Sequence, residues 1–414
     1  MNRRRFLAAG ATALAACATS VGKARPRVVV VGAGFGGATL AKYIALWDRG
    51  IDVTLVERGE RFISCPISNL VLGGTRTMQD ITQNYDGLRK YGVQLAKAEA
   101  LAIDSAKRTI SLSGGSTLPY DRLVLSPGVD FLFDEVQGYD AAGSRILHAW
   151  KAGAQTVELR RRLEAMPEGG VYLLSVPLAP YRCPPGPYER ACQVAHYFKR
   201  AKPRAKVLVL DANADVTSKG PLFKRAWEEL YKGMIEYHPN AKVVAVDPAA
   251  MSVRTDFDTV KGDVLNVVPP QRAADIAAKT GLITHNNRWC DVDWRTLESK
   301  AQPGIHLLGD ATLSASGMPK SGHMANQHAK VCAAALIELL NGRAPNATPV
   351  MNITCYSFVS DKEVIHVASV HQYEPVQNAL LPVKGAGGVS AARSELEGQY
   401  AWSWAQNIWA DMLA

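Results

Sequence analysis

Blocks of apolar and polar residues alternate along this chain and predict strand, helix, strand in repeated order. Residues 28–31 are a continuous β-branched run, which is typical of a strand buried on both faces. A helical pattern follows over 38–47, and a second apolar strand over 51–56 ends at Glu57. The order recurs over 169–233, where strand and helix patterns alternate again. The pattern therefore predicts an α/β protein with two units, each built on a parallel sheet.

Three glycines lie between the first strand and its helix. Gly32, Gly34 and Gly37 have the spacing G-x-G-x-x-G. The first permits a tight turn, the second lets a pyrophosphate approach the backbone, and the third lets helix and strand pack closely. Glu57 stands where a carboxylate accepts hydrogen bonds from a ribose diol. The order of these features favours a dinucleotide-binding unit over a generic strand–helix turn.

A second signature of a bound flavin lies in residues 303–339. A strand pattern ends at Gly309 and Asp310, and a helix is expected to begin near Ser321. The Asp310 carboxylate would accept a hydrogen bond from the ribityl chain, and the positive helix end would face the pyrimidine edge of the flavin. Lys320, directly before that helix, is assigned to the same site. The alternative for Asp310 is a plain helix N-cap.

The second unit has the element order of a nicotinamide-binding domain but not its glycine loop. Between strand and helix it reads Ser-Val-Pro-Leu-Ala-Pro-Tyr-Arg-Cys-Pro-Pro-Gly-Pro. Prolines fix φ and remove N–H donors, so this loop cannot form the amide cradle that a pyrophosphate needs. Cys183 occupies the loop instead, and Glu189 follows on the helix.

A chain of 414 residues exceeds what one core usually serves. The predicted segments are an export signal, a first part of an FAD-binding domain, an NAD-like domain without the glycine loop, a second FAD-binding part, and a C-terminal α+β interface domain. Their bounds are 1–25, 26–140, 141–274, 275–348 and 349–414. In the last segment, Cys355 is expected at a strand start, and Trp402, Trp404 and Trp409 form a cluster typical of core or interface packing.

The N-terminus carries the pattern of a twin-arginine export signal. Consecutive arginines precede Phe6 and Leu7, and a short alanine-rich run follows. This pattern predicts export of the folded chain to the periplasm; the alternative is a frayed basic terminus. Cys17 lies in a sequence that resembles a lipoprotein cleavage box, so a lipid anchor there is a lesser alternative to release.

Charge and cysteine usage exclude several classes. The formal net charge is +9, but residues 1–25 hold five cations and no acid, so the rest carries +4. That mild excess gives no argument for nucleic acid. No apolar run reaches the ~18–20 residues of a membrane span. The seven cysteines form no C-x-x-C, haem or metal motif, and three of them read as core residues: Cys192, Cys290 and Cys332.

These motifs together resemble the flavoprotein subunit of flavocytochrome c sulfide dehydrogenase, a two-dinucleotide-domain flavoprotein similar in fold to glutathione reductase. The resemblance spans nearly the whole chain after the export signal and rests on the glycine fingerprint, Ser-Cys-Pro-Ile-Ser-Asn, Arg-Cys-Pro-Pro-Gly-Pro-Tyr-Glu-Arg-Ala, Gly-Asp-Ala-Thr, Ile-Thr-Cys-Tyr-Ser and the tryptophan-rich end. It implies that Cys65 binds FAD through a thioether. It also implies that Cys183 and Cys355 form a redox disulfide beside the flavin, with Glu189 nearby.

The resemblance implies a chemistry as well. Hydrosulfide would attack the disulfide, and FAD would take two electrons and return them singly to a haem. Because this chain has no haem motif, the haem is expected on a c-type cytochrome subunit in a heterodimer. The attacked cysteine and the sulfur product stay open. For the cysteine pair, the alternative is an inert stabilising disulfide.

Two other functions compete with this one. A sulfide:quinone oxidoreductase or type II NADH dehydrogenase would need a membrane-seeking C-terminal helix or an NAD glycine loop, and neither is evident in the sequence. A non-enzymatic alternative is a flavin-loaded module that docks a cytochrome. Serine at Cys183 or Cys355 would leave sulfide-dependent cytochrome c reduction intact only in that last case.

Overall fold

The computed structural model describes residues 24–139 and 145–414, so the predicted export signal and Cys17 lie outside the described residues. The first unit is built on a seven-stranded sheet in the order β19-β20-β21-β9-β1-β2-β5. Five of its strands are parallel, and β19 and β20 add an antiparallel edge. The bounds are β1 (Arg27–Val31), β2 (Asp52–Glu57), β5 (Gln94–Lys97), β9 (Arg122–Leu125), β19 (Val292–Asp293), β20 (Glu298–Ser299) and β21 (Ile305–Leu307).

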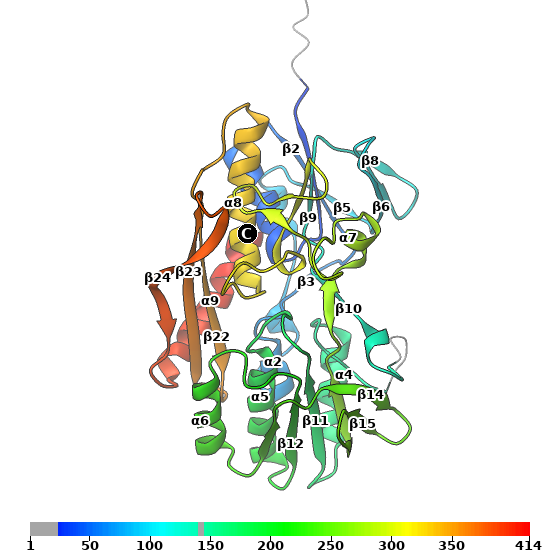
Figure 1. Cartoon of the computed structure of the whole chain (residues 1–414), viewed down its shortest axis with the longest axis vertical. Helices are drawn as coiled ribbons and strands as arrows, with labels where there is room; N and C mark the ends of the chain where they lie inside the picture. The colour runs from blue at the N-terminus through cyan, green and yellow to red at the C-terminus, as the bar shows by residue number, and fades with distance from the viewer. Residues whose placement is uncertain (1–23, 140–144) are drawn as a thin grey trace, which may run out of the picture.

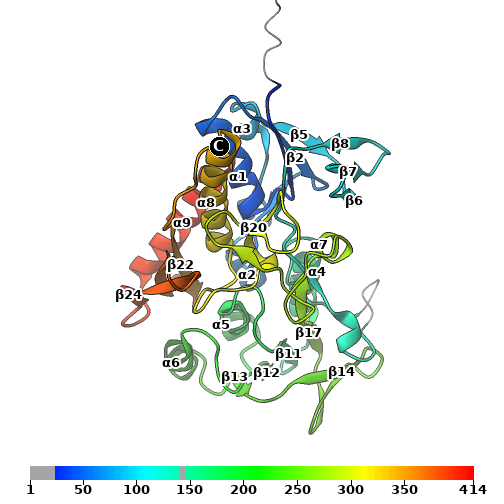
Figure 2. The ribbon, with the colours of Figure 1, turned by 45° about the horizontal axis from the view of Figure 1, so that its top comes forward.

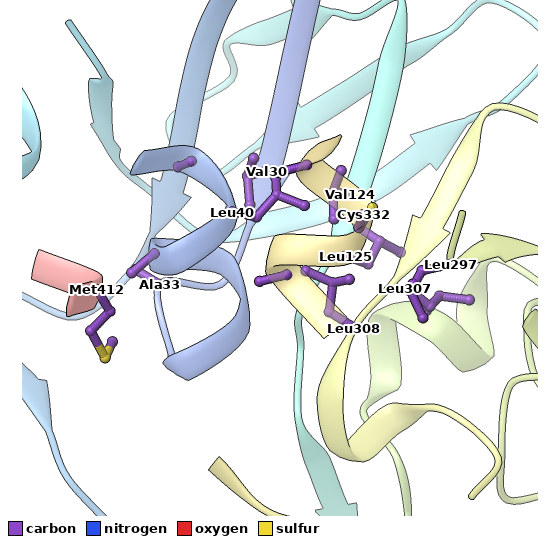
Figure 3. Packing of buried hydrophobic residues seen from close by; sticks show 14 of the residues in the cluster. Val30, Ala33, Leu40, Val124, Leu125, Leu297, Leu307, Leu308, Cys332 and Met412 are labelled. Carbon is purple, nitrogen blue, oxygen red and sulfur yellow. The ribbon is translucent and has the colours of Figure 1, made fainter. Parts of the chain in front are cut away.

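Two long helices, α1 (Phe35–Trp47) and α8 (Gly322–Leu340), pack side by side against this sheet (Figure 1). Figure 3 shows Leu40 of α1 and Cys332 of α8 among the apolar side chains Val30 and Val124 of the central strands. All four are fully buried. All four residues of the β-branched run 28–31 are buried, as the lack of alternation between apolar and polar positions predicts.

The second unit has a four-stranded parallel sheet in the order β13-β12-β11-β17. Figure 1 shows this unit at the bottom of the molecule, with its helices beside the sheet. Its elements are α4 (Ala154–Ala165), β11 (Val171–Val176), α5 (Gly186–Ala201), β12 (Lys206–Asp211), α6 (Gly220–Leu230), β13 (Ile235–His238), β14 (Val243–Asp247), β15 (Ser252–Thr255), β16 (Thr259–Lys261) and β17 (Val264–Val267).

The chain crosses between the units twice, and the two crossings pair with each other. Strand β10 (Val129–Phe131) leaves the first unit and pairs antiparallel with β18 (Gln271–Ala273), which returns to it. The smaller elements of the first unit are β3 (Phe62–Ile63), α2 (Ser68–Gly73), β4 (Thr82–Gln83), α3 (Asp86–Arg89), β6 (Ala100–Asp104), β7 (Thr109–Leu112), β8 (Thr117–Pro119) and α7 (Asp275–Lys279). Short 3-10 turns lie at Gln79–Ile81, Phe133–Glu135 and Gly309–Ala311.

The C-terminal part is an antiparallel sheet followed by a helix: β22 (Val350–Phe358), β23 (Val364–Glu374), β24 (Ala379–Val389) and α9 (Glu395–Leu413). Figure 2 shows it beside α8. Asp411 of α9 accepts hydrogen bonds from Tyr43 of α1 and Asn326 of α8, which attaches the last helix to the first unit. Cys355 is the sixth residue of β22, so its expected place at the strand start was wrong: pairing with β23 begins five residues earlier.

The predicted fold class is confirmed: two dinucleotide-binding-type units and a C-terminal α+β part. The residue bounds given for the five domains stay a prediction. Among the described helices, none is long and apolar enough to cross a bilayer. Residues 24–139 and 145–414 also contain no group of three His, Cys, Asp or Glu side chains suited to hold a metal ion.

Candidate active site

A cavity of about 1060 Å³ lies where the two units and the C-terminal sheet meet. The glycine turn after β1 and the end of β2 line it from the first unit. The loop around Cys183 and the start of α5 line it from the second unit, and residues 354–356 of β22 line it from the C-terminal part. A cavity at the carboxyl ends of parallel strands is the usual place for a ligand in α/β proteins.

The three fingerprint glycines have the geometry that the spacing predicts. Gly32 has φ of +91°, and a Cβ there would lie 2.4 Å from the Ser126 carbonyl oxygen. A Cβ on Gly37 would lie 1.8 Å from the Gly32 carbonyl oxygen, so only glycine lets α1 pack this closely. A Cβ on Gly34 would meet nothing within 4 Å. Gly32 and Gly34 line the cavity, and their backbone is open to a phosphate. Gly37 does not line the cavity and instead lets α1 pack against the glycine turn.

Glu57 lines the cavity at the end of β2 and is held in place by the backbone. One carboxylate oxygen accepts from the Ala33 N–H over 2.8 Å, and the other accepts from the Gly59 N–H over 2.7 Å. Each oxygen keeps a second lone pair. The carboxylate is therefore positioned to receive the two hydroxyls of a ribose.

Asp310 provides the strongest structural argument for a flavin. Its side chain lines the cavity, and Oδ1 is buried without a hydrogen-bond partner among the described residues. Burial raises the pKa of Asp310. This carboxyl accepts no hydrogen bond from a described backbone N–H. The N-cap of α8 is Ser321, whose side chain accepts from the Met324 N–H over 3.1 Å. An orphaned buried acceptor needs a donor, and a ribityl hydroxyl is one. The residues present therefore fit FAD.

Lys320 does not line the cavity. Its buried ammonium donates to the carbonyl oxygens of Asp310 and Thr312 and lies 3.7 Å from the centre of the Trp289 ring. Burial lowers the pKa of Lys320 to about 7. Its own carbonyl accepts from the Cys183 N–H over 2.8 Å. Lys320 thus joins the Asp310 segment to the Cys183 loop without lining the cavity. Its direct contact with a cofactor stays a prediction.

Cys183 and Cys355, 172 residues apart in the sequence, line the same cavity. Both are free thiols in this structure, and burial raises the pKa of each. Cys355 raises the pKa of Cys183 further, and both cysteines raise the pKa of a shared neighbour, Lys219. Cys183 has φ of +58°, and a Cβ on Gly186 would lie 2.9 Å from the Cys183 sulfur. The tight proline-rich loop therefore holds this sulfur at the start of α5.

Glu189 lies one turn into α5 and is buried between the two cysteine-bearing segments. Its carboxylate accepts from the Asn69 side chain over 2.7 Å and from the Phe358 N–H over 2.8 Å. Burial raises the pKa of Glu189, although these hydrogen bonds act in the opposite direction. The carboxyl therefore cross-links α2, α5 and β22 around the cavity.

Two buried cations near the cysteines were missed by the sequence analysis. Arg190 donates to the Asn69 side chain over 3.1 Å and to the His148 and Ala149 carbonyl oxygens over 2.9 and 2.8 Å. Lys219 donates to the Cys355 carbonyl oxygen over 3.1 Å. Nothing in the sequence marked either residue, because a lysine before a helix and an arginine within one usually face solvent.

Cys65 lines the cavity from the loop before α2. Its sulfur accepts from the Ala152 N–H over 3.5 Å, and its carbonyl oxygen accepts from the Ser68 hydroxyl over 2.6 Å. Ile67, two residues on, has φ of +76°, an uncommon conformation for a β-branched residue. The loop is thus shaped to present the sulfur, and a thioether to a flavin stays a prediction.

The second unit lacks a free acid at the position that Glu57 has in the first. Asp211 ends β12, but it is fully buried. It accepts from the Tyr188 hydroxyl over 2.7 Å and from the Tyr237 hydroxyl over 2.9 Å. This carboxylate is therefore used within the protein, which agrees with the absence of a glycine cradle after β11.

The tryptophans of α9 have different surroundings. Trp402 and Trp409 are in edge-to-face contact with ring centres 5.9 Å apart, which is the packing role expected for the cluster. Trp404 lines the cavity and lies 5.8 Å from the His323 ring. The end of the chain therefore contributes one aromatic wall to the site.

The fold and the site together define a flavin-dependent oxidoreductase of the pyridine nucleotide-disulfide oxidoreductase type. Residues 26–160 match the family model described as pyridine nucleotide-disulphide oxidoreductase. Residues 156–269 match the central part of the sulfide dehydrogenase [flavocytochrome c] flavoprotein chain, and residues 347–413 match the flavin-binding part of flavocytochrome c sulphide dehydrogenase.

Similar proteins point the same way. The chain is 60% identical over 45 residues, 11% of its own length, to the sulfide dehydrogenase [flavocytochrome c] flavoprotein chain of Chlorobaculum thiosulfatiphilum, and the match covers 94% of that sequence. It is 24% identical to the mitochondrial sulfide:quinone oxidoreductase of Mus musculus, over 72% of this chain and 67% of that one. The chain belongs to the family of flavocytochrome c sulfide dehydrogenase flavoprotein subunits.

A solved structure shows the same fold. The sulfide:quinone oxidoreductase of Aquifex aeolicus superposes with a TM-score of 0.74 at 18% identity, covering 94% of this chain and 91% of that one. At this identity the likeness concerns the arrangement of the units.

Proposed function

We propose that this protein oxidises hydrogen sulfide through a redox disulfide between Cys183 and Cys355, with FAD as the electron store. The observation that carries the proposal is the placement of both cysteines in one cavity with the open glycine turn and the orphaned Asp310 carboxyl. Cysteines from two distant segments line the cavity in which a flavin fits, which an inert disulfide would not require.

The residue types support this chemistry. Hydrosulfide is a nucleophile for which a disulfide is the natural electrophile. Attack on one sulfur breaks the S–S bond, leaves a persulfide on that cysteine and releases the other as a thiolate. Release of the sulfane sulfur as sulfur or polysulfide leaves both cysteines reduced, and the disulfide is restored when the pair gives up two electrons, for which FAD would be the acceptor. Overall, HS⁻ yields sulfur, a proton and two electrons. FAD supplies the capacity to accept two electrons and return them one at a time.

We propose a c-type cytochrome subunit as the electron acceptor. The support is the family itself, whose name joins a flavoprotein chain to a cytochrome. Because this chain has no haem attachment motif, the haem would lie on the partner. A quinone is the second candidate, since relatives include sulfide:quinone oxidoreductases. The two acceptors can be distinguished by supplying each to the sulfide-reduced protein.

Two finer proposals concern Cys65 and the cell compartment. Cys65 lines the cavity, which supports a thioether to the flavin. The paired arginines before Phe6 support export of the folded, flavin-loaded chain by the twin-arginine route to the periplasm. A lipid anchor at Cys17 is the lesser alternative.

Anaerobic mixing of the flavin-loaded protein with sulfide tests the central proposal. We expect sulfide to bleach the flavin absorbance, and subsequent addition of cytochrome c to restore it with reduction of the haem. Bleaching followed by reoxidation with a quinone analogue but not with cytochrome c would favour the quinone acceptor. No bleaching at millimolar sulfide would reject the proposed function.

A further inference from the structure

Lys219 is a buried ammonium directly behind the strand that carries Cys355. Lys219 directly precedes α6 and has φ of +57°. The residue is 8% exposed. Nζ donates to the Cys355 carbonyl oxygen over 3.1 Å, to the Ser357 hydroxyl over 2.8 Å and to the Ile365 carbonyl oxygen over 3.3 Å. These three acceptors fix the cation on β22 and β23, beneath the cavity.

This cation forms no ion pair with a carboxylate in the part of the chain that the structure describes. A buried charge that has hydrogen-bond acceptors but no ionic partner is costly, so its retention calls for a function. Burial lowers the pKa of Lys219 to about 8, whereas neighbouring groups raise it: Cys355 most, then Glu189, Cys183 and Glu397. The ammonium is therefore charged at pH 7, and the group that raises its pKa most is the Cys355 sulfur in its ionised form.

The two cysteines are not equivalent with respect to this charge. For Cys355, burial raises the pKa, and Lys219 is the largest opposing influence, followed by a hydrogen bond from Ser321. For Cys183, burial raises the pKa, and Cys355 and Glu189 raise it further before Arg182 and Lys219 oppose them. Glu189 and Asp310 also disfavour a charge on Cys355, but their effects come after that of Lys219.

We propose that Lys219 is a positioning residue that stabilises Cys355 as the thiolate leaving group when hydrosulfide opens the disulfide. The inference rests on the proposed function and adds the direction of attack. HS⁻ attacks the Cys183 sulfur, the Cys183–Cys355 bond breaks, and the products are a Cys183 persulfide and a Cys355 thiolate. One negative charge enters and one remains, now beside the buried ammonium. A leaving thiol with a lower pKa departs faster, so the charge decides which sulfur is attacked.

The test uses flavin-loaded protein whose cysteines are reduced anaerobically with a phosphine. The reduced protein is alkylated with iodoacetamide at a series of pH values, and peptide mass spectrometry measures the alkylation rates of Cys355 and Cys183. In the wild type, Cys355 should react faster than Cys183 and at lower pH. Lys219→Met should shift the Cys355 profile to higher pH and slow its alkylation at pH 7.5 about tenfold or more. Lys219→Arg should keep most of the wild-type rate, because it keeps the charge.

Lys224→Met is the matched control, because Lys224 is on α6, the helix that directly follows Lys219, and forms a half-exposed pair with Asp215 over 2.7 Å. Its Cys355 profile should be that of the wild type. An unchanged Cys355 profile in Lys219→Met, or faster alkylation of Cys183 in the wild type, would overturn the inference. The wild-type comparison decides the matter if Lys219→Met fails to fold.

Trapping of the persulfide after one equivalent of sulfide tests the direction separately. The sulfane sulfur should be found on the peptide of Cys183. These outcomes are distinct from failure of the proposed function, which would appear as absence of flavin bleaching by sulfide in the wild type. Bleaching with the persulfide on Cys355 would leave the function standing and reject the role of Lys219.

Discussion

The Glu189 carboxylate accepts a hydrogen bond from the backbone N–H of Phe358 over 2.8 Å. Glu189 follows Cys183 by six residues, and Phe358 follows Cys355 by three, so this one contact joins the two cysteine-bearing segments. It fixes the C-terminal sheet against α5. The distance between the two sulfurs therefore depends on a carboxyl that forms hydrogen bonds with neither of them.

Removal of this carboxyl should loosen the site. Glu189→Ala leaves the Phe358 N–H as a buried donor without an acceptor, at a cost of about 1–3 kcal/mol, and leaves the Asn69 amide with only the Gly186 carbonyl oxygen as acceptor, over 3.3 Å. We expect a melting temperature lower by several degrees and a slower bleaching of the flavin by sulfide. Glu164→Ala, at an exposed helix pair, is the control and should change little. Equal melting temperatures for the two variants would show that the cross-link is dispensable.

Replacement of either cysteine should abolish turnover without unfolding the protein. Cys183→Ser and Cys355→Ser keep the volume of each side chain but remove the disulfide electrophile. Sulfide-dependent cytochrome c reduction should fall by at least about a thousandfold, a loss typical of removing a group that acts in the chemistry. Flavin absorbance should remain. Cys192→Ser is a control for serine at a buried cysteine, and retained activity in the two site variants would favour a cytochrome-docking module instead.

The flavin should migrate with the polypeptide on a denaturing gel. A thioether at Cys65 survives denaturation, so ultraviolet light should reveal a fluorescent band at the mass of the chain. Cys65→Ser should lose that band yet still bind FAD in the native state, because Glu57 and the glycine turn are intact. A fluorescent band in Cys65→Ser would place the linkage elsewhere, and its absence from the wild type would exclude a covalent bond.

Acid should destabilise the protein through His328. Its Nδ1 accepts from the Gly309 N–H over 3.1 Å, and burial lowers the pKa of His328 to about 3. An unfolded histidine has a pKa of about 6.5. Between these two values the unfolded chain binds more protons than the folded one, so stability falls as pH falls, by about 1.4 kcal/mol per pH unit from this residue.

The comparison that isolates this effect is the unfolding free energy of wild type and His328→Gln at pH 6.5 and 5.0. The wild type should lose about 2 kcal/mol more than the variant over that interval. The Glu189 and Asp310 carboxyls, whose pKa values are raised by burial, bind protons more readily in the folded state and act in the opposite direction in both proteins. His238→Gln, at an exposed strand position, is the control. Identical losses in wild type and His328→Gln would contradict the prediction.

The sequence by itself determined the first unit and predicted its cofactor residues. A β-branched run, three glycines at fixed offsets, a helix and an acid lie within about thirty residues, and local backbone geometry decides what such a stretch can form. Gly32 and Gly37 therefore have the close contacts that their spacing predicts, whereas the contact of Glu57 with a ribose stays a prediction. The missing amide cradle of the second unit could be predicted for the same reason, because prolines act locally.

The tertiary structure alone decided which distant groups share the cavity. Cys355 could be assigned to the site from the sequence only by resemblance, and its position inside β22 depends on pairing with β23. Lys219 and Arg190 look like solvent-facing cations in the sequence, yet the closure of the second unit against β22 and α2 buries both. Burial and the pKa shifts that follow from it depend on contacts between segments far apart in the chain, and no local pattern contains that information.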